Sequence, residues 1–262
     1  MNTELTQEAI IRFSGIHVAF GSNRVFEGLE LSVRRDEILT ILGESGCGKS
    51  VLLKVILGLV PWQQGSVNVD GHTLSPGHDS DLLAVRRKVG MVFQGGALFD
   101  SLTVFDNIAY PLRERGISDR AQLRKRAGEV LEMVGLPGIE AKMPAELSGG
   151  MRKRVALARA IAEAPKVLLY DEPTTGLDPV NVRRISELIV ALRERLGVTA
   201  VVVTHDLASA FMISDRIAMV AERRIAAIGS NESLQRSSDP RVRRFLDAMP
   251  LGSTEALPGG GP

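Results

Sequence analysis

The sequence is short of three things: cysteine, an excess of one charge, and long apolar runs. Among its 262 residues only Cys47 is a cysteine, so no disulfide can form within the chain, which favours a reducing compartment. Lys and Arg number 32 and Asp and Glu number 31, and the formal charge of +1 argues against a protein that coats nucleic acid. The longest apolar run is interrupted by Lys54, well short of the ~18 residues that a membrane span requires.

The N-terminus also lacks a targeting signal. The first stretch, MNTELTQEAI, contains acidic residues and lacks the basic-then-apolar order of a secretory signal. We therefore expect a cytosolic enzyme or binding subunit that contacts a membrane only through partners. What the chain does have is 44% hydrophobic and 24% charged residues, enough for a sizeable core. We predict one domain over residues 1–250 and a flexible Gly- and Pro-rich tail at 251–262.

Short apolar runs alternate with helical patterns along most of the chain. Such runs are typical of parallel strands covered on both faces, so the order predicts an α/β fold with a mainly parallel core sheet. The predicted strands are residues 37–42, 166–170 and 199–204, and the predicted helices are residues 48–60, 181–196 and 206–213.

Three other segments have a different pattern. Residues 11–33 alternate as antiparallel strands do, with a turn at 21–23, and residues 216–228 resemble a hairpin. Residues 95–164 are mostly helical and carry several basic clusters. We expect an N-terminal antiparallel β subdomain and a helical subdomain inserted into the α/β core.

A glycine-rich loop between the first predicted strand and helix carries a phosphate-binding pattern. Gly43, Gly48, Lys49 and Ser50 match G-x-x-x-x-G-K-[ST] in the strand-to-helix context that this motif requires. Such turns can also serve packing alone, but the Lys-Ser pair favours a nucleoside triphosphate. Backbone N–H groups would surround the phosphates, Lys49 would reach the β- and γ-phosphates, and Ser50 would bind Mg²⁺. The expected ATP-binding residues of this loop are Gly43, Ser45, Gly46, Cys47, Gly48, Lys49, Ser50 and Val51.

Two carboxylates end the second predicted strand, in the sequence VLLYDEP. Asp171 is placed to hold Mg²⁺ through water, and Glu172 to polarise the water that attacks the γ-phosphate. Two solvated acids at a strand end would be the ordinary interpretation without the phosphate loop. His205 follows the third strand, where it could keep the water and Glu172 aligned, although a lone histidine there is often structural.

The segment LSGGM, before the Asp-Glu pair, resembles the signature motif of ABC-type ATPases. The resemblance extends over residues 11–228 and implies a P-loop NTPase of the ABC ATPase type. It implies that Ser148, Gly149 and Gly150 bind ATP across a head-to-tail homodimer. It further implies that Gln94 is the Q-loop glutamine near Mg²⁺ and γ-phosphate, that Asp178 belongs to the D-loop, that His205 is the switch histidine, and that Phe20 stacks on adenine.

Longer runs, including GKSVLLKVILGL and MVFQGGALFDSLTVFDNIAYPLRE, look like the ATPase subunits of Mla-type phospholipid transporters. Met151, where most ABC ATPases have Gln, supports that subgroup. The resemblance implies a peripheral protein on the cytoplasmic side of the inner membrane of a Gram-negative envelope. Its partners would be an MlaE-type permease, an MCE-domain lipid-binding protein and a STAS-domain protein. Leu98 and Phe99 would seat a permease helix, or would simply be core residues.

Other functions remain to be separated. A DNA-repair ABC protein would need a long coiled coil between the phosphate loop and the signature, a translation factor would need two such domains, and a kinase would lack LSGG. An importer for a small polar solute such as an amino acid shares every catalytic motif, so it is the main alternative. A pure interaction module would not hydrolyse ATP.

Overall fold

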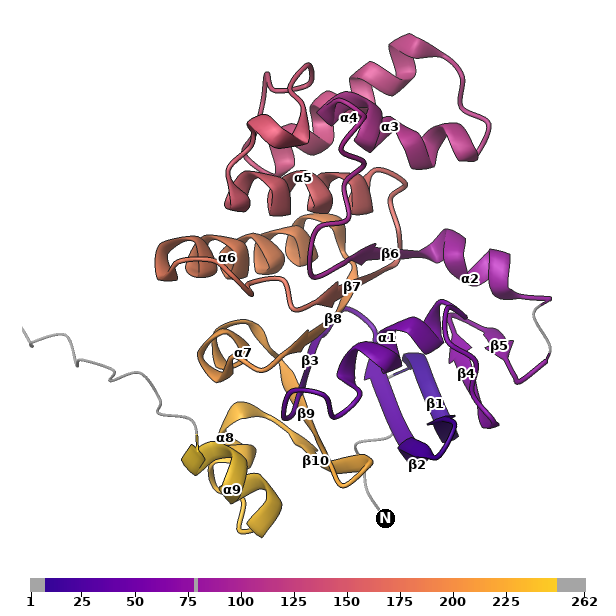
Figure 1. Cartoon of the computed structure of the whole chain (residues 1–262), viewed down its shortest axis with the longest axis vertical. Coiled ribbons are helices and arrows are strands. Elements are labelled where there is room, and N and C mark those ends of the chain that lie inside the picture. The colour runs from indigo at the N-terminus through magenta and orange to yellow at the C-terminus, as the bar shows by residue number, and fades with distance from the viewer. Residues whose placement is uncertain (1–7, 78–79, 249–262) are drawn as a thin grey trace, which may run out of the picture.

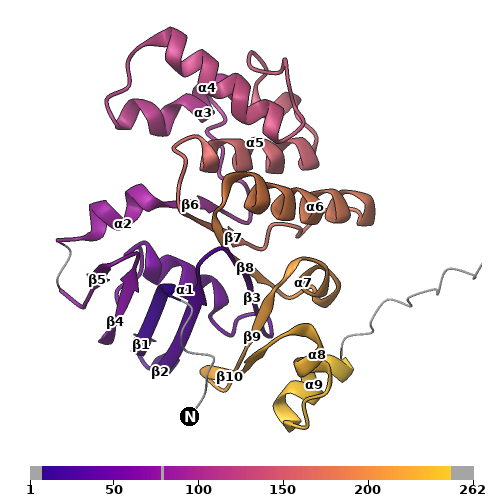
Figure 2. The same cartoon turned by 180° about the vertical axis from the view of Figure 1, so that it is seen from behind.

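Two β-sheets and a layer of helices make up the fold (Figure 1; Figure 2 from behind). The computed structural model describes residues 8–77 and 80–248. The tail predicted at 251–262 lies outside the described residues, so the division into one domain and a tail stays a prediction. None of the described helices is both long and apolar enough to cross a lipid bilayer.

The larger sheet has the order β10-β9-β3-β8-β7-β6. Its strands run parallel except for β10, which pairs antiparallel with β9 at the edge. The three predicted parallel strands are confirmed as its centre, within one residue at each end, and the predicted hairpin is β9 with β10. The bounds are β3 (Ile38–Leu42), β6 (Val89–Val92), β7 (Val167–Asp171), β8 (Thr199–Thr204), β9 (Arg216–Ala221) and β10 (Arg224–Gly229).

Alternate residues of β7 enter two different hydrophobic clusters. Leu169 belongs to the cluster that contains helix α1 (Lys49–Ile56) and the smaller sheet. Leu168 and Tyr170 belong to the cluster on the opposite face, with the helical layer. Since successive strand residues point to opposite faces, burial on both faces explains why this strand is almost uniformly apolar until Asp171.

The smaller sheet, β2-β1-β4-β5, is antiparallel, and α1 lies between it and the larger sheet (Figure 1). Its first two strands, β1 (Ala9–Phe20) and β2 (Asn23–Arg34), confirm the predicted antiparallel pair and its turn. The short elements that follow have no counterpart among the elements predicted from the sequence. These are β4 (Gln64–Val69), β5 (His72–Leu74) and α2 (Leu82–Lys88).

Helix α1 is shorter than predicted, because it ends at Ile56 rather than at Val60. Gly58 adopts a left-handed conformation (φ 59°). The N–H of Leu59 donates to the carbonyl of Lys54 at 2.8 Å, and the N–H of Gly58 donates to that of Val55 at 3.0 Å. This glycine-terminated Schellman arrangement stops the helix before Pro61 is reached.

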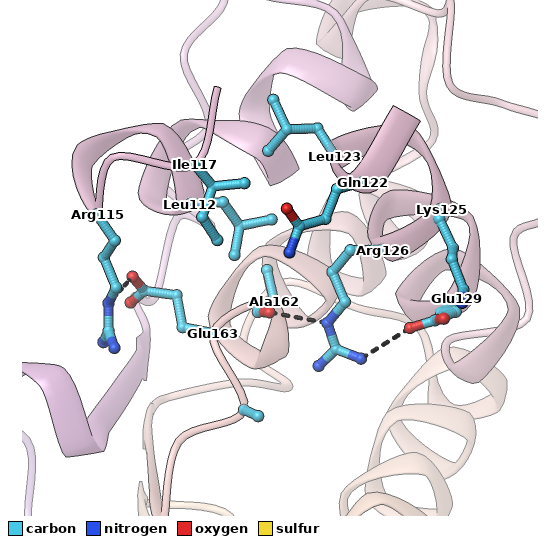
Figure 3. Close-up of a pocket in the computed structure, with 11 residues that line it drawn as sticks. Leu112, Arg115, Ile117, Gln122, Leu123, Lys125, Arg126, Glu129, Ala162 and Glu163 are labelled. Carbon is cyan, nitrogen blue, oxygen red and sulfur yellow. Dashed lines mark hydrogen bonds and ion pairs between the residues drawn. The ribbon is translucent and has the colours of Figure 1, made fainter. Parts of the chain in front are cut away.

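The predicted helical insertion is confirmed as helices α3 (Val104–Glu114), α4 (Arg120–Met133) and α5 (Gly149–Ile161), with a 3₁₀ turn, η2 (Pro144–Glu146), between the last two. A cavity of about 450 Å³ lies where they meet (Figure 3). Arg126 of α4 reaches across it and donates to the carbonyls of Ala162 and Ile161, at 2.8 and 3.0 Å. A cation on these carbonyls satisfies the C-terminal end of α5 and ties the helices together.

The remaining helices are α6 (Pro179–Leu196), α7 (Leu207–Ile213), α8 (Asn231–Gln235) and α9 (Pro240–Ala248). Helix α6 lies between α5 and the larger sheet in both views (Figures 1 and 2). It begins two residues before the predicted start, because Asp178 caps it and Pro179 occupies its first position.

The buried carboxylate of Asp70 forms hydrogen bonds with cations from several strand ends. Asp70, between β4 and β5, accepts hydrogen bonds from Arg35, Lys88 and Lys166 at 2.6–2.9 Å. Its side chain is 7% exposed. Burial opposes its ionisation, but the hydrogen bonds from the three cations outweigh burial and hold the pKa of this carboxyl well below its usual range.

Candidate active site

The glycine-rich loop lies between β3 and α1, as predicted, and two of its glycines leave no room for a side chain. A Cβ at Gly48 would lie 2.4 Å from Val25 Cγ1 and 3.0 Å from Phe26 Cζ, and φ there is 101°. A Cβ at Gly43 would lie 2.7 Å from Cys47 Sγ. The loop is therefore held close to the smaller sheet, with the N-terminus of α1 at its end.

Lys49 is the first residue of α1, and its ammonium turns back into the loop. It is 5% exposed, and Nζ donates to the carbonyls of Gly43 at 2.8 Å and Glu44 at 2.9 Å. Both partners are neutral carbonyls, so these contacts do not neutralise the positive charge of Lys49 at the centre of the loop. A phosphate is the kind of group that such a charge attracts.

Ser50 and Asp171 meet at the end of β7. The Ser50 hydroxyl donates to Asp171 Oδ1 at 2.5 Å, and Asp171 is 6% exposed. A hydroxyl and a carboxylate side by side are oxygen ligands suited to Mg²⁺, which usually takes few protein ligands and completes its shell with water and phosphate. Among the described residues, no group of three or more His, Cys, Asp or Glu is arranged to hold a metal ion by itself.

Glu172 follows Asp171 in a left-handed conformation, with φ 49°. Its N–H donates to the carbonyl of Val203 at 2.9 Å, which fixes the backbone beside β8. Its Oε2 accepts from the Thr175 hydroxyl at 3.1 Å and lies 2.9 Å from His205 Nδ1. A non-glycine residue with positive φ costs on the order of 1 kcal/mol and is often found at functional positions.

A cavity of about 340 Å³ collects most of the predicted residues. Its lining comes from the glycine-rich loop, the start of α1, the segment after β6 and the ends of β7 and β8. The lining residues are Ser45, Gly46, Gly48, Lys49, Ser50, Val51, Gln94, Glu172 and His205. A carboxylate, a histidine and a glutamine thus face the loop that would hold the phosphates, which is the arrangement needed to position a water for attack on phosphorus.

Cys47 is outside that lining. It is half-buried, packs against the core, and burial raises the pKa of its thiol. These contacts fit the sequence interpretation of a space-filling residue and not a redox group, since a raised pKa lowers the thiolate fraction.

The signature residues do not line the cavity either. Ser148 caps α5, accepting a hydrogen bond from the Met151 N–H at 3.3 Å, and Gly149 and Gly150 form the first turn. A Cβ at Gly150 would lie 3.0 Å from Asn181 Oδ1, so this turn touches the start of α6. Ser148 and Gly149 are exposed.

Asp178 and Phe20 also lie outside the cavity. Asp178 accepts from the backbone N–H of Asn181 at 3.0 Å, and the hydrogen bonds from Asn181, this one first, hold the pKa of the carboxyl below its usual range. Phe20, at the end of β1, is 48% exposed. An exposed ring of this kind leaves a face available for stacking.

Lys153 is a residue of this region that sequence analysis missed. It is 8% exposed, and Nζ donates to the backbone carbonyl of Gln94. Burial lowers its pKa, while the charges of Glu172 and Asp171 act in the opposite direction. In the sequence it is one of three basic residues in RKR, and nothing there distinguishes the buried one from its neighbours.

A sequence model of the family described as "ABC transporter" matches residues 26–175, more than half of the chain. The chain belongs to the ABC transporter family of ATP-binding proteins. A second model, described as "AAA domain, putative AbiEii toxin, Type IV TA system", matches the shorter segment 143–209. As an ABC transporter ATPase, the protein binds and hydrolyses ATP, which excludes the pure interaction module.

Two groups of relatives resemble this ABC ATPase. The intermembrane phospholipid transport system ATP-binding protein MlaF of Escherichia coli (strain K12) is 43% identical over 232 residues, covering 88% of this chain and 86% of the relative. The probable ribonucleotide transport ATP-binding protein mkl of Mycobacterium leprae is 39% identical over 242 residues, covering 92% of this chain and 70% of the relative. Because the two groups have similar sequence identity to this chain, the comparison supports membership of the family more firmly than it supports any one substrate.

Solved structures confirm the predicted fold. CbiO1 from Clostridium perfringens, part of the transporter complex cbiONQ, has a TM-score of 0.80 at 27% identity, over 92% of this chain and 95% of that one. The ATP-binding cassette MJ0796, solved as a dimer in a post-hydrolysis state bound to ADP and Pi, has a TM-score of 0.75 at 33% identity. That match covers 84% of this chain and 98% of the cassette.

Proposed function

We propose that this ABC ATPase drives a transporter that moves phospholipid between the membranes of a Gram-negative envelope. The observation that carries the proposal is the similarity to MlaF along most of the chain, together with Met151 in the signature. The expected partners are an MlaE-type permease, an MCE-domain protein and a STAS-domain protein. The ATPase would sit on the cytoplasmic side of the inner membrane and contact lipid only through these partners.

A polar-solute transporter is the second candidate. The mycobacterial relatives, described as probable ribonucleotide transport proteins, favour a polar substrate at a similar level of identity. The set of motifs inside the ATPase is common to both kinds of transporter, because substrate is bound by the permease and not by the nucleotide site. The distinction therefore has to be made on the assembled complex.

The cavity residues divide into binding and chemical roles. The loop N–H groups and Lys49 would hold the phosphates, and Ser50 and Asp171, with Gln94, would hold Mg²⁺, which neutralises phosphate charge when bound. Glu172 would accept a proton from the attacking water. His205, 2.9 Å from Glu172, would keep that carboxylate and the γ-phosphate in register.

The signature would complete the site of a second copy of the chain. Ser148 and the following glycines form a helix N-terminus with free donors, yet they lie outside the cavity of their own chain. The MJ0796 cassette, which was solved as a dimer, supports a homodimer, and in our proposal each signature faces the partner's nucleotide. ATP binding would then favour the closed dimer and hydrolysis would reopen it, because ATP contacts both chains only when closed.

A groove beside the segment after Gln94 would seat a permease helix. It has a volume of about 620 Å³, and its lining includes Met91, Phe99 and Tyr110. Phe99 is 42% exposed and packs on Tyr110 with ring centroids 4.8 Å apart. Leu98 instead packs partly buried against the core. These contacts favour the docking interpretation for Phe99 and the core interpretation for Leu98.

The deciding experiment is purification of the membrane complex through a tag on this chain, followed by mass spectrometry of bound small molecules. Phospholipid at near-stoichiometric amounts, with ATP hydrolysis that changes when lipid is exchanged, would support the proposal. ATP hydrolysis that responds to an added amino acid or to a ribonucleotide other than ATP, and not to lipid, would refute the phospholipid proposal in favour of the polar-solute transporter.

A further inference from the structure

Helix α5 is attached to the segment that follows Gln94 at more than one place. Near its N-terminus, Lys153 donates to the Gln94 carbonyl. Near its C-terminus, the Arg159 guanidinium donates to the carbonyls of Gly96 at 2.9 Å and Ala97 at 2.7 Å. Hydrogen bonds from a charged donor are stronger than those between neutral groups, so these bonds hold the backbone of the segment against α5.

Direct packing accompanies these bonds. A Cβ at Gly96 would lie 3.5 Å from Ala156 Cβ, so the loop backbone rests on the helix between the two cations. Arg159 also lies over the Phe99 ring, 5.9 Å from its centroid. The segment therefore follows one face of α5 from the nucleotide cavity to the groove that contains Phe99.

Lys153 lies at the end of this segment that is nearest the nucleotide cavity. Its side chain is buried, and its charge interacts with Glu172 and Asp171. Ser148, the N-cap of the same helix, lies five positions earlier and is exposed. A buried ammonium requires polar partners, and the Gln94 carbonyl supplies one to Lys153.

We propose that Lys153 is a positioning residue for ATP hydrolysis: its hydrogen bond to the Gln94 carbonyl keeps the Gln94 side chain in the cavity beside Glu172. This inference rests on the roles proposed above for Gln94 and Glu172.

The test uses the full chain and three substitutions of Lys153. Lys153→Met keeps an unbranched side chain but removes the donor, whereas Lys153→Arg and Lys153→Gln keep an N–H donor. Since misplacement of about 1 Å can cost up to ~100-fold, we expect kcat of Lys153→Met to fall roughly 10- to 100-fold. The KM for ATP should change less, by about threefold at most, because the phosphate-loop contacts are untouched. At least one donor-bearing variant should recover most of kcat.

Lys125→Met is the matched control, because Lys125 is exposed on α4 and should tolerate the change with kcat unaltered. Melting temperatures are measured for all variants, and kcat is compared below the lowest of them. The inference is overturned if Lys153→Met turns over at the wild-type rate. It is also overturned if neither donor-bearing variant recovers activity while melting normally. Glu172→Gln is run in parallel: if that variant stays active, the assigned base is wrong, whatever Lys153 does.

Discussion

Glu172→Gln tests the proposed chemistry most directly. The side chain is 11% exposed, and its Oε2 accepts from Thr175 and lies beside His205. Glutamine has the same length and keeps a carbonyl oxygen for these neighbours, so the geometry should survive. What it loses is the basic carboxylate. The substitution therefore separates proton transfer from the shape of the site.

The expected loss follows from the role of a general base. Removing one typically costs 10²–10⁴-fold, and 100-fold corresponds to about 2.7 kcal/mol in the activation free energy. The free energy of unfolding should change by less than about 1 kcal/mol, because no cavity is made and the adjacent Asp171 loses a like-charged neighbour. ATP affinity should persist, since Lys49 and the loop are unaltered.

The assay is phosphate release with Mg²⁺ and ATP, together with gel filtration in the same buffer. We expect hydrolysis to fall at least ~100-fold and a dimer to accumulate with ATP, because the closed state forms but does not reopen. Glu222→Gln is the control: Glu222 has the same φ of 49°, and its side chain is 72% exposed. Turnover of Glu172→Gln within about threefold of wild type would refute the assignment, since base loss costs far more.

Three further predictions concern assembly, docking and stability. Lys49→Ala should abolish ATP binding to its own chain, and Ser148→Arg should spare it but block the dimer; mixing the two should restore part of the activity through one intact composite site, and no recovery at all would argue against two independent head-to-tail sites. Phe99→Asp should keep the wild-type fold and basal hydrolysis to within about 1 kcal/mol of stability, because the ring is partly exposed, yet lose permease binding in a pull-down; early melting would instead make Phe99 a core residue. Asp70→Asn should cost roughly 2 kcal/mol at pH 7, because the neutral amide loses the charge-assisted hydrogen bonds from Arg35, Lys88 and Lys166. Because the pKa of Asp70 is lower in the folded state, this contribution to stability is complete above the unfolded value of about 3.9 and is lost as pH falls towards the folded value. The free energies of unfolding of the two proteins, measured by urea denaturation, should therefore converge in acid. A difference between them that does not depend on pH would contradict the ion-pair explanation.

The parts of the fold that could be predicted are those whose sequence pattern lies within one contiguous segment. The strand ending at Asp171 is apolar because both of its faces are buried, and this is visible as a run of letters. The motif loop is likewise local, since its glycines, lysine and serine are contiguous. Residues 64–92 gave no such signal, because β4, β5, α2 and β6 are each three to seven residues long and depend on pairing with distant strands.

The helix end at Ile56 shows a second limit. Proline cannot continue a helix, so Pro61 predicts an end at Val60. Gly58 in the left-handed conformation ends the helix earlier, through hydrogen bonds that form only once the turn is made. Lys153 shows a third. Its burial depends on where the segment after Gln94 crosses α5, and these two parts of the chain are 59 positions apart.

The contact of Gly48 with Val25 and Phe26 bears on how natural variation in this protein should be interpreted. These two side chains lie outside every motif by which a nucleotide site is detected, yet they fill the space where a side chain on the loop would go. A larger residue at either position would press on the phosphate loop from outside, and a smaller one would loosen it. Changes in ATP affinity among variant alleles can therefore originate in the first hairpin of the chain, where a search confined to the motifs would record no difference.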